Sequence, residues 1–135
     1  MSIEIDHLGI AVRGLDEALL FWQQQLGMPL QGRETVAAES VRVAMLPAGD
    51  SSGSPRIELL EPSEDDSTIA KFLEKRGPGL HHIALKVDDL AATVAQLKNA
   101  GATLLNEARI GAGGHEYAFV HPRSTGGVLL ELIQR

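Results

Sequence analysis

Two histidines and two glutamates stand at matching places in the two halves of the chain. His7 and His82 each lie in a short apolar run and are 75 residues apart, while Glu58 and Glu131 each lie between apolar residues and are 73 residues apart. A carboxylate on an apolar strand costs free energy unless it is paired, hydrogen-bonded or bound to a metal. Each half thus offers one imidazole and one carboxylate, and we predict that the four side chains bind one divalent metal ion.

The donor set limits the metal and suggests its chemistry. Two imidazoles and two carboxylates, with no sulfur ligand, suit divalent cobalt, manganese, nickel, iron, zinc or magnesium, and the residues do not choose among these metals. An octahedral ion with four protein ligands keeps two positions for a chelating substrate, such as the two oxygens of a dicarbonyl compound. Taken singly, each histidine is better explained as a structural residue and each glutamate as a residue on the wet face of a sheet. The symmetric set of four favours the metal site.

The other histidines and the glycine-rich loop carry weaker signals. His81 is adjacent to His82, and neighbouring strand residues point to opposite faces, so His81 is predicted to be structural. His115 and His121 are expected in loops or on the surface, with contact to the substrate left open as the alternative. The loop at 111–114 lacks the lysine and the strand-to-helix setting of a phosphate-binding loop, and it predicts no phosphate site.

The elements that must position the four residues also repeat. The apolar run around each histidine predicts a strand, and the leucines that follow at helical spacing predict a helix. The first half is expected to hold a strand over 3–12, a helix over about 15–26, and two or three further strands, two of them over 41–46 and 56–61. The second half is expected to hold a strand over 81–87, a helix from about Asp89 to Gly101, and strands near 103–106, 116–121 and 127–133. We predict one domain over 1–135, with module one at about 3–61, a connector at 62–79 that contains a short helix, and module two at about 80–135.

Composition narrows the partners and the compartment. The 135 residues suit one compact domain, and the net charge of −6 argues against nucleic acid or an anionic membrane as the main partner. The absence of cysteine excludes disulfides and thiolate metal sites and fits a reducing compartment. No signal peptide and no apolar segment of membrane-spanning length is recognised, so a cytoplasmic location is expected.

Several longer segments resemble one family, the methylmalonyl-CoA epimerases of the vicinal-oxygen-chelate superfamily, over nearly the whole chain. The most specific segments are Asp6–Val12, Arg56–Pro62, Ser67–Leu73 with Gly79–Ala84, and His121-Pro122 with Gly127–Leu132. The resemblance implies an α+β fold in which two tandem βαβββ modules form an open, cleft-enclosing mixed sheet. It also implies a divalent metal cofactor, an acyl-CoA substrate and a homodimer, which would cover exposed sheet edges.

The activity that this resemblance implies is inversion at C2 of methylmalonyl-CoA, which links its (R) and (S) forms in propionate metabolism; ethylmalonyl-CoA stays open as a substrate. A cation bound to the thioester and carboxylate oxygens would stabilise the enolate, and two acid–base groups would exchange the proton. His7, His82 and Glu131 match the metal ligands of the family, and Glu58 stands where a glutamine or glutamate completes the set. Glu131 is expected to be one of the proton-transfer groups as well.

The chain departs from the family at one position. Some members carry a second catalytic glutamate on the strand that corresponds to 41–46, and this chain has no acid there. Glu34 or Glu39 could reach in from the preceding loop, so the second acid–base residue is unassigned. Arg42, on that strand, could contact a substrate carboxylate or be a solvated residue.

Alternatives follow from the same residues. Coenzyme A needs cationic partners, and the candidates are Lys71, Lys75, Arg76 and Arg123, each of which could equally be a solvated surface charge.

A glyoxalase-like lyase acting on a glutathione hemithioacetal would use the same ligands and the same enolate chemistry. A non-catalytic binding module would need no metal. An iron dioxygenase is disfavoured, because its sites usually use two histidines and one carboxylate.

Overall fold

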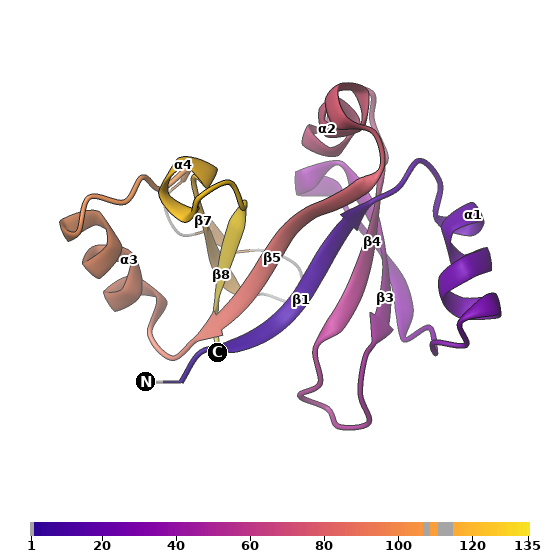
Figure 1. Cartoon of the computed structure of the whole chain (residues 1–135), viewed down its shortest axis with the longest axis horizontal. Coiled ribbons are helices and arrows are strands. Elements are labelled where there is room, and N and C mark those ends of the chain that lie inside the picture. Colours follow the sequence, from indigo (N-terminus) through magenta and orange to yellow (C-terminus); the bar gives the residue numbers. More distant parts are fainter. Residues whose placement is uncertain (1, 107–108, 111–114) are drawn as a thin grey trace. The chain divides into compact units, whose positions relative to one another are not determined.

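A computed structural model describes residues 2–106, 109–110 and 115–135 (Figure 1). The chain divides into two compact units, which are described separately. The first unit is His7–His81, and the second unit combines the residues before His7 with His82–Arg135. The predictions for 111–114 lie outside the described residues.

The first unit holds a mixed sheet with the strand order β2-β3-β4-β1. Strand β3 is antiparallel to both β2 and β4, while β1 is parallel to β4. Its elements in chain order are β1 (Glu4–Ala11), α1 (Leu15–Leu19), the π-helical turn η1 (Leu20–Gln25), β2 (Gly32–Val36), the 3-10 turn η2 (Ala37–Glu39), β3 (Val41–Pro47), β4 (Arg56–Pro62) and α2 (Thr68–Arg76). Strand β1 begins in the second unit.

The second unit repeats this plan with the strand order β5-β8-β7-β6. Here β5 and β8 are parallel, and β7 is antiparallel to both β8 and β6. Its elements are β5 (Gly79–Val87), which begins in the first unit, α3 (Leu90–Asn99), β6 (Arg109–Ile110), β7 (Glu116–Val120), the short helix α4 (Pro122–Thr125) and β8 (Leu130–Gln134). Both halves therefore have the predicted order of strand, helix and further strands, which is βαβββ.

In each unit the helix that follows the first strand packs against the face of the sheet opposite the histidine. In the first unit, α1 covers one face, where Leu46 and Leu59 have no exposed surface. Burial of such a leucine stabilises the fold by about 1.5–3 kcal/mol. Helix α2 covers the opposite face through Ile69 and Leu73, which pack with Ala11, Val41, Val43 and Leu60. In the second unit, α3 packs on the face of β8 that carries Leu132.

Local chemistry explains where the helices begin and end. Ser67 Oγ accepts the backbone N–H of Ala70 and caps α2, and a carboxylate oxygen of Asp89 accepts that of Ala92 and caps α3, both at 3.0 Å. Gly101 has φ +94°, a left-handed conformation that glycine adopts readily, and it follows α3 where the sequence predicts a stop.

The structure corrects three of the predicted elements. The helix over about 15–26 is α-helical only to Leu19 and continues as η1. The strand predicted near 103–106 is reduced to a single bridge between Leu104 and Val120, and strand β6 lies later. Strand β8 begins at Leu130 and not at 127, because Gly126 and Gly127 have φ +83° and +116°, outside the extended region of strand residues.

Candidate functional site

The first unit brings His7 and Glu58 together on parallel strands. His7 Nδ1 lies 3.3 Å from Glu58 Oε2, with His7 buried and the glutamate side chain 13% exposed. Gly9 of β1 stands opposite Glu58 in the strand register, and His7 lies two residues earlier on the same face of β1. The strand pairing therefore sets this histidine–glutamate pair.

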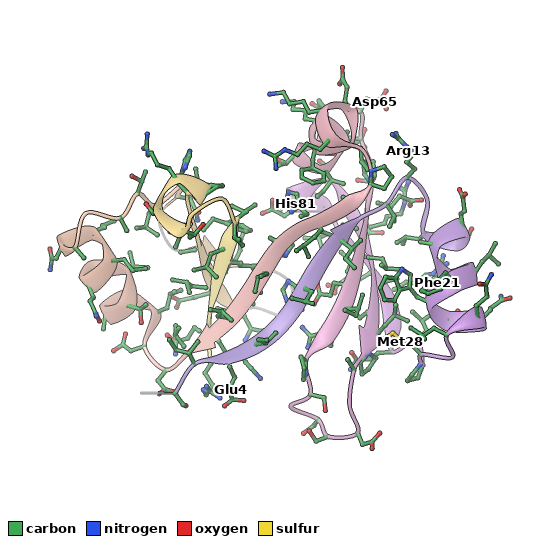
Figure 2. All side chains as sticks on the ribbon, viewed as in Figure 1. Glu4, Arg13, Phe21, Met28, Asp65 and His81 are labelled. Carbon is green, nitrogen blue, oxygen red and sulfur yellow. The ribbon has the colours of Figure 1, made fainter. Side chains whose placement is uncertain are left out.

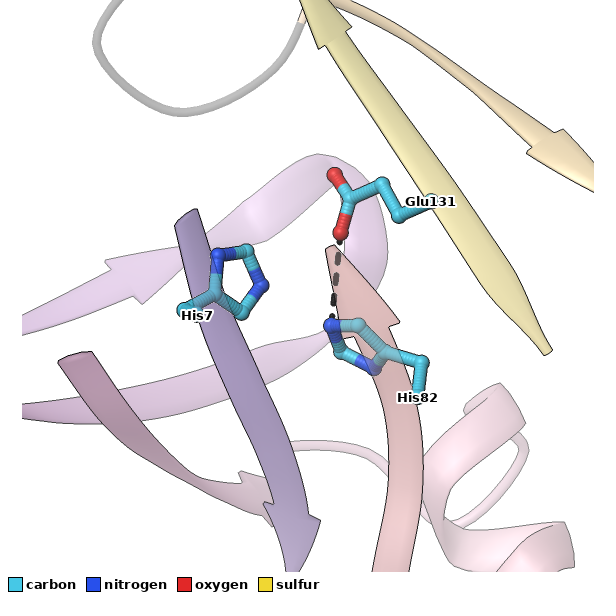
Figure 3. Close-up of side chains that lie close together, drawn as sticks. All are labelled: His7, His82 and Glu131. Carbon is cyan, nitrogen blue, oxygen red and sulfur yellow. Dashed lines mark ion pairs between the residues drawn. The ribbon is translucent and has the colours of Figure 1, made fainter. Parts of the chain in front are cut away.

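The second unit contains the equivalent pair, His82 and Glu131 (Figure 3). His82 Nε2 lies 3.3 Å from Glu131 Oε1, again with a buried histidine and a glutamate side chain that is 13% exposed. Here Ala84 stands opposite Glu131, so a small residue occupies the position that Gly9 has in the first unit. The ring of Phe119, which also stands opposite Glu131, contacts His82 edge-to-face with centroids 6.0 Å apart.

The four residues predicted from the sequence are thus found as two histidine–carboxylate pairs, one in each unit. Each pair combines an imidazole nitrogen and a carboxylate oxygen, which are donors for divalent cations and groups that can transfer protons. The pairs differ in one respect, because His7 faces its glutamate through Nδ1 and His82 through Nε2. In the first unit, His7 and Glu58 lie on the face of the sheet opposite α1. In the second unit, His82 and Glu131 lie on the face opposite α3.

The remaining histidines have other surroundings. His81 is visible at the start of β5 near α2 (Figure 2), where its ring contacts Phe72 edge-to-face with centroids 4.9 Å apart. His121 Nδ1 accepts the backbone N–H of Arg123 at 2.9 Å and caps α4, which gives this histidine a structural role. His115 is exposed.

Arg42 has a carboxylate partner within the protein. Its Nε donates to Glu61 Oε2 at 2.6 Å, on the α1 face of the sheet, which is the face opposite Glu58. This favours the second of the two interpretations of Arg42, a partly exposed strand residue, over a contact with substrate. Glu39 lies in η2, as expected for a connecting segment, but Glu34 lies on strand β2 and not in a loop.

Arg56 is absent from the residues predicted for the site, although it lies beside the first pair. Its Nη2 and Nε lie 3.0 and 3.3 Å from Glu58 Oε2, the same oxygen that faces His7. The signal was present in the sequence, because residues two apart on a strand point to one face. The positive charge of Arg56 therefore acts directly on the Glu58 carboxylate that faces His7.

A separate shallow cleft of about 340 Å³ lies in the first unit near α1 and the edge strand β2. Arg33 and Arg42 line it, and each guanidinium already pairs with a carboxylate, Asp16 or Glu61. The cleft contains neither His7 nor Glu58 and is therefore not the candidate site.

The predicted coenzyme A contacts are exposed cations. Lys71, Lys75 and Arg76 lie on α2, and the last two follow the preference of cations for the end of a helix. The guanidinium of Arg76 also lies 6.0 Å from the ring centre of Phe72. Arg123 Nη2 donates to Thr103 Oγ1 at 3.3 Å.

Among the described residues, no helix is both long and apolar enough to cross a membrane.

Comparison with known proteins agrees with the repeated architecture. A sequence model of the glyoxalase/bleomycin resistance protein/dioxygenase superfamily matches residues 6–119. The ethylmalonyl-CoA/methylmalonyl-CoA epimerase of Cereibacter sphaeroides is 36% identical over 133 residues, which are 96% of this chain and 96% of that protein.

Two solved structures extend this agreement to three dimensions. Methylmalonyl-CoA epimerase from Mycobacterium tuberculosis is 40% identical with a TM-score of 0.87, over 96% of this chain and 86% of that one. A methylmalonyl-CoA epimerase in complex with methylmalonyl-CoA and NH4+ is 37% identical with a TM-score of 0.91, over 99% and 95% of the two chains. The predicted fold class, two tandem βαβββ modules of the vicinal-oxygen-chelate type, is confirmed.

Proposed function

This chain belongs to the glyoxalase/bleomycin resistance protein/dioxygenase superfamily, and on that premise we propose that it is a methylmalonyl-CoA epimerase, which interconverts the (R) and (S) forms at C2 through an enolate. The observation that carries the proposal is the pair of equivalent histidine–glutamate contacts, His7 with Glu58 and His82 with Glu131, in a chain that resembles epimerases of similar length. The proposal agrees with the function predicted from the sequence.

We further propose that His7, Glu58, His82 and Glu131 together bind one divalent metal ion. Their chemistry supports this, since two imidazoles and two carboxylates form a donor set for cobalt, manganese, nickel, iron, zinc or magnesium. The bound metal would act as a Lewis acid that stabilises negative charge on the substrate oxygens. The matching places of the two histidines and of the two glutamates in the repeated sequence also support this proposal.

Glu131 is the proposed proton-transfer group on one face of the substrate. The proton at C2 lies between a thioester and a carboxylate, and its removal needs a positioned base as well as stabilisation of the enolate. Glu131 is mostly buried, and His82 and the ring of Phe119 lie around it, which limits the access of water to the carboxylate. Inversion requires a second group on the other face, for which Glu34 and Glu39 are the candidates.

The remaining parts of the proposal concern substrate, assembly and location. Lys71, Lys75, Arg76 and Arg123 are the proposed partners of the coenzyme A phosphates, as exposed cations on an otherwise acidic chain. We also propose a homodimer in the cytoplasm. Sedimentation equilibrium of the purified protein and fractionation of cells that express it would test these two statements.

The decisive experiment is proton NMR of (2R,S)-methylmalonyl-CoA in deuterated water. The protein is supplied in turn with cobalt, manganese and EDTA, and we expect loss of the C2 proton signal with metal and a stable signal with EDTA. A stable signal with every metal would overturn the proposed function. Glutathione with methylglyoxal serves as the comparison substrate, and turnover of it without C2 exchange would favour the glyoxalase-like lyase.

A further inference from the structure

Arg56 places a positive charge on the first histidine–glutamate pair. Two of its nitrogen atoms lie 3.0 and 3.3 Å from Glu58 Oε2, and His7 Nδ1 lies 3.3 Å from the same oxygen. The side chains of Arg56 and Glu58 are only 29% and 13% exposed, so solvent screens this contact less than it screens a surface ion pair.

The strand geometry fixes where this charge lies. Arg56 stands opposite His7 in the pairing of β4 with β1, and its two-residue spacing from Glu58 puts both side chains on one face of β4. The guanidinium thus comes from a paired strand inside a sheet and not from a flexible loop. Its position beside the proposed metal ligands is a property of the fold.

Charge counting shows what an arginine at this position would do. A divalent cation with two neutral histidines and two carboxylates has no net charge. The proposed substrate adds a carboxylate and, after loss of the C2 proton, an enolate oxygen, both of which are anionic. Without a further cation, the centre would present no net positive charge to the two anionic groups. Arg56 restores one positive charge and at the same time competes with the metal for Glu58.

We propose that Arg56 is a positioning and charge-compensating residue that weakens metal binding through Glu58 and strengthens binding of the anionic acyl substrate. This inference rests on the proposed function, because it assumes the metal ion and the acyl-CoA substrate. The Arg56 side chain is thus expected to lower the affinity for the metal and to raise the affinity for the substrate. An arginine that merely held Glu58 in place would instead strengthen metal binding.

The variant Arg56→Met tests this inference through two separate measurements. Calorimetric titration of metal-free protein with Mn²⁺ is expected to show binding at least about tenfold tighter than in the unaltered chain, because a like charge has been removed. The KM for methylmalonyl-CoA is expected to rise about tenfold, with a smaller change in kcat. Unchanged or weaker Mn²⁺ binding by Arg56→Met would overturn the inference.

Matched variants separate charge from structure. Arg56→Lys keeps the charge and should retain a KM close to that of the unaltered chain. The double variant Arg56→Met with Glu58→Gln removes one positive and one negative charge, so its net charge equals that of the unaltered chain. Its KM should therefore return most of the way to the value of the unaltered chain. A KM that stays as high as in Arg56→Met would contradict charge compensation. Circular dichroism of each variant verifies that it is folded.

The control is Arg33→Met on β2, an arginine that pairs with Asp16 on the opposite face of the same sheet. It should leave both Mn²⁺ affinity and KM unchanged, and an equal effect there would show that the measurements report overall charge and not the site. If the unaltered chain binds no Mn²⁺, the proposed metal site is wrong, and the proposed role of Arg56 is wrong as well. If the unaltered chain binds Mn²⁺ and Arg56→Met binds it with the same affinity, only the inference on Arg56 is overturned.

Discussion

Glu61 on β4 accepts the backbone N–H of Leu15, the first residue of α1, with Oε1 at 3.1 Å from the nitrogen. The second unit has the same device, since Gln134 Oε1 on β8 accepts the N–H of Leu90 at 2.8 Å. In both units the capping residue follows the site glutamate by three positions and so points to the other face of the strand. The last strand of each half therefore carries the carboxylate on one face and caps the helix with the other.

This relationship predicts that Glu61 contributes to stability. Glu61→Ala removes the cap of α1 and the partner of Arg42, and we expect the free energy of unfolding to fall by about 1–2 kcal/mol. Urea unfolding monitored by circular dichroism measures this change. Glu61→Gln keeps an acceptor for the Leu15 N–H and should lose less than half as much; an equal loss in both variants would show that the charge, and not the cap, matters.

Glu131→Gln tests the proposed proton-transfer group. The amide cannot accept the C2 proton, so we expect deuterium exchange of the form whose C2 proton faces Glu131, and inversion with it, to fall by about 10²–10⁴-fold while the fold is retained. Proton NMR of methylmalonyl-CoA in deuterated water measures the rate. The matched control is Glu116→Gln, an exposed glutamate on the neighbouring strand β7, which should exchange at the unaltered rate. Undiminished exchange of both the (R) and the (S) form by Glu131→Gln would exclude Glu131 as the base.

The two site histidines are expected to matter about equally for metal binding. Because His7 and His82 occupy equivalent positions in the two units, replacing either by alanine should weaken Mn²⁺ binding by more than about a hundredfold, beyond the effect typical of residues that only support a ligand. Calorimetric titration measures this, with the exposed His115→Ala as the control. A large effect in only one of the two variants would contradict a site shared by both units.

The repeat explains how much of the structure follows from the sequence. The sequence of each half contains an apolar run with a histidine and a later apolar run with a glutamate. The four site residues and the order of the elements could therefore be predicted. Strand β2 could not, because Val36 is the only large apolar residue among its five and an edge strand buries little. The contact of Arg56 with Glu58 follows from their two-residue spacing, but the pairing of Glu61 with Arg42 depends on strand register, which residue types and local spacing do not determine.

Strand register also separates the two candidates for the second acid–base group. Glu34 stands opposite Val43 on β3, and Val43 packs with α2 on the face that carries Glu58, so the pleat directs Glu34 to that face. Glu39 lies in η2, outside the paired strands. We therefore expect Glu34→Gln, and not Glu39→Gln, to block inversion.

The informative measurement for Glu34→Gln uses the separate (R) and (S) forms of methylmalonyl-CoA in deuterated water. Loss of one of two bases on opposite faces should leave exchange of one form through Glu131, because the remaining base still removes and returns a proton on its own face. Inversion should fall by about 10²-fold or more, since it needs both faces. Blocked exchange of both forms would assign Glu34 a binding role, and unaffected inversion would leave the second group to another residue.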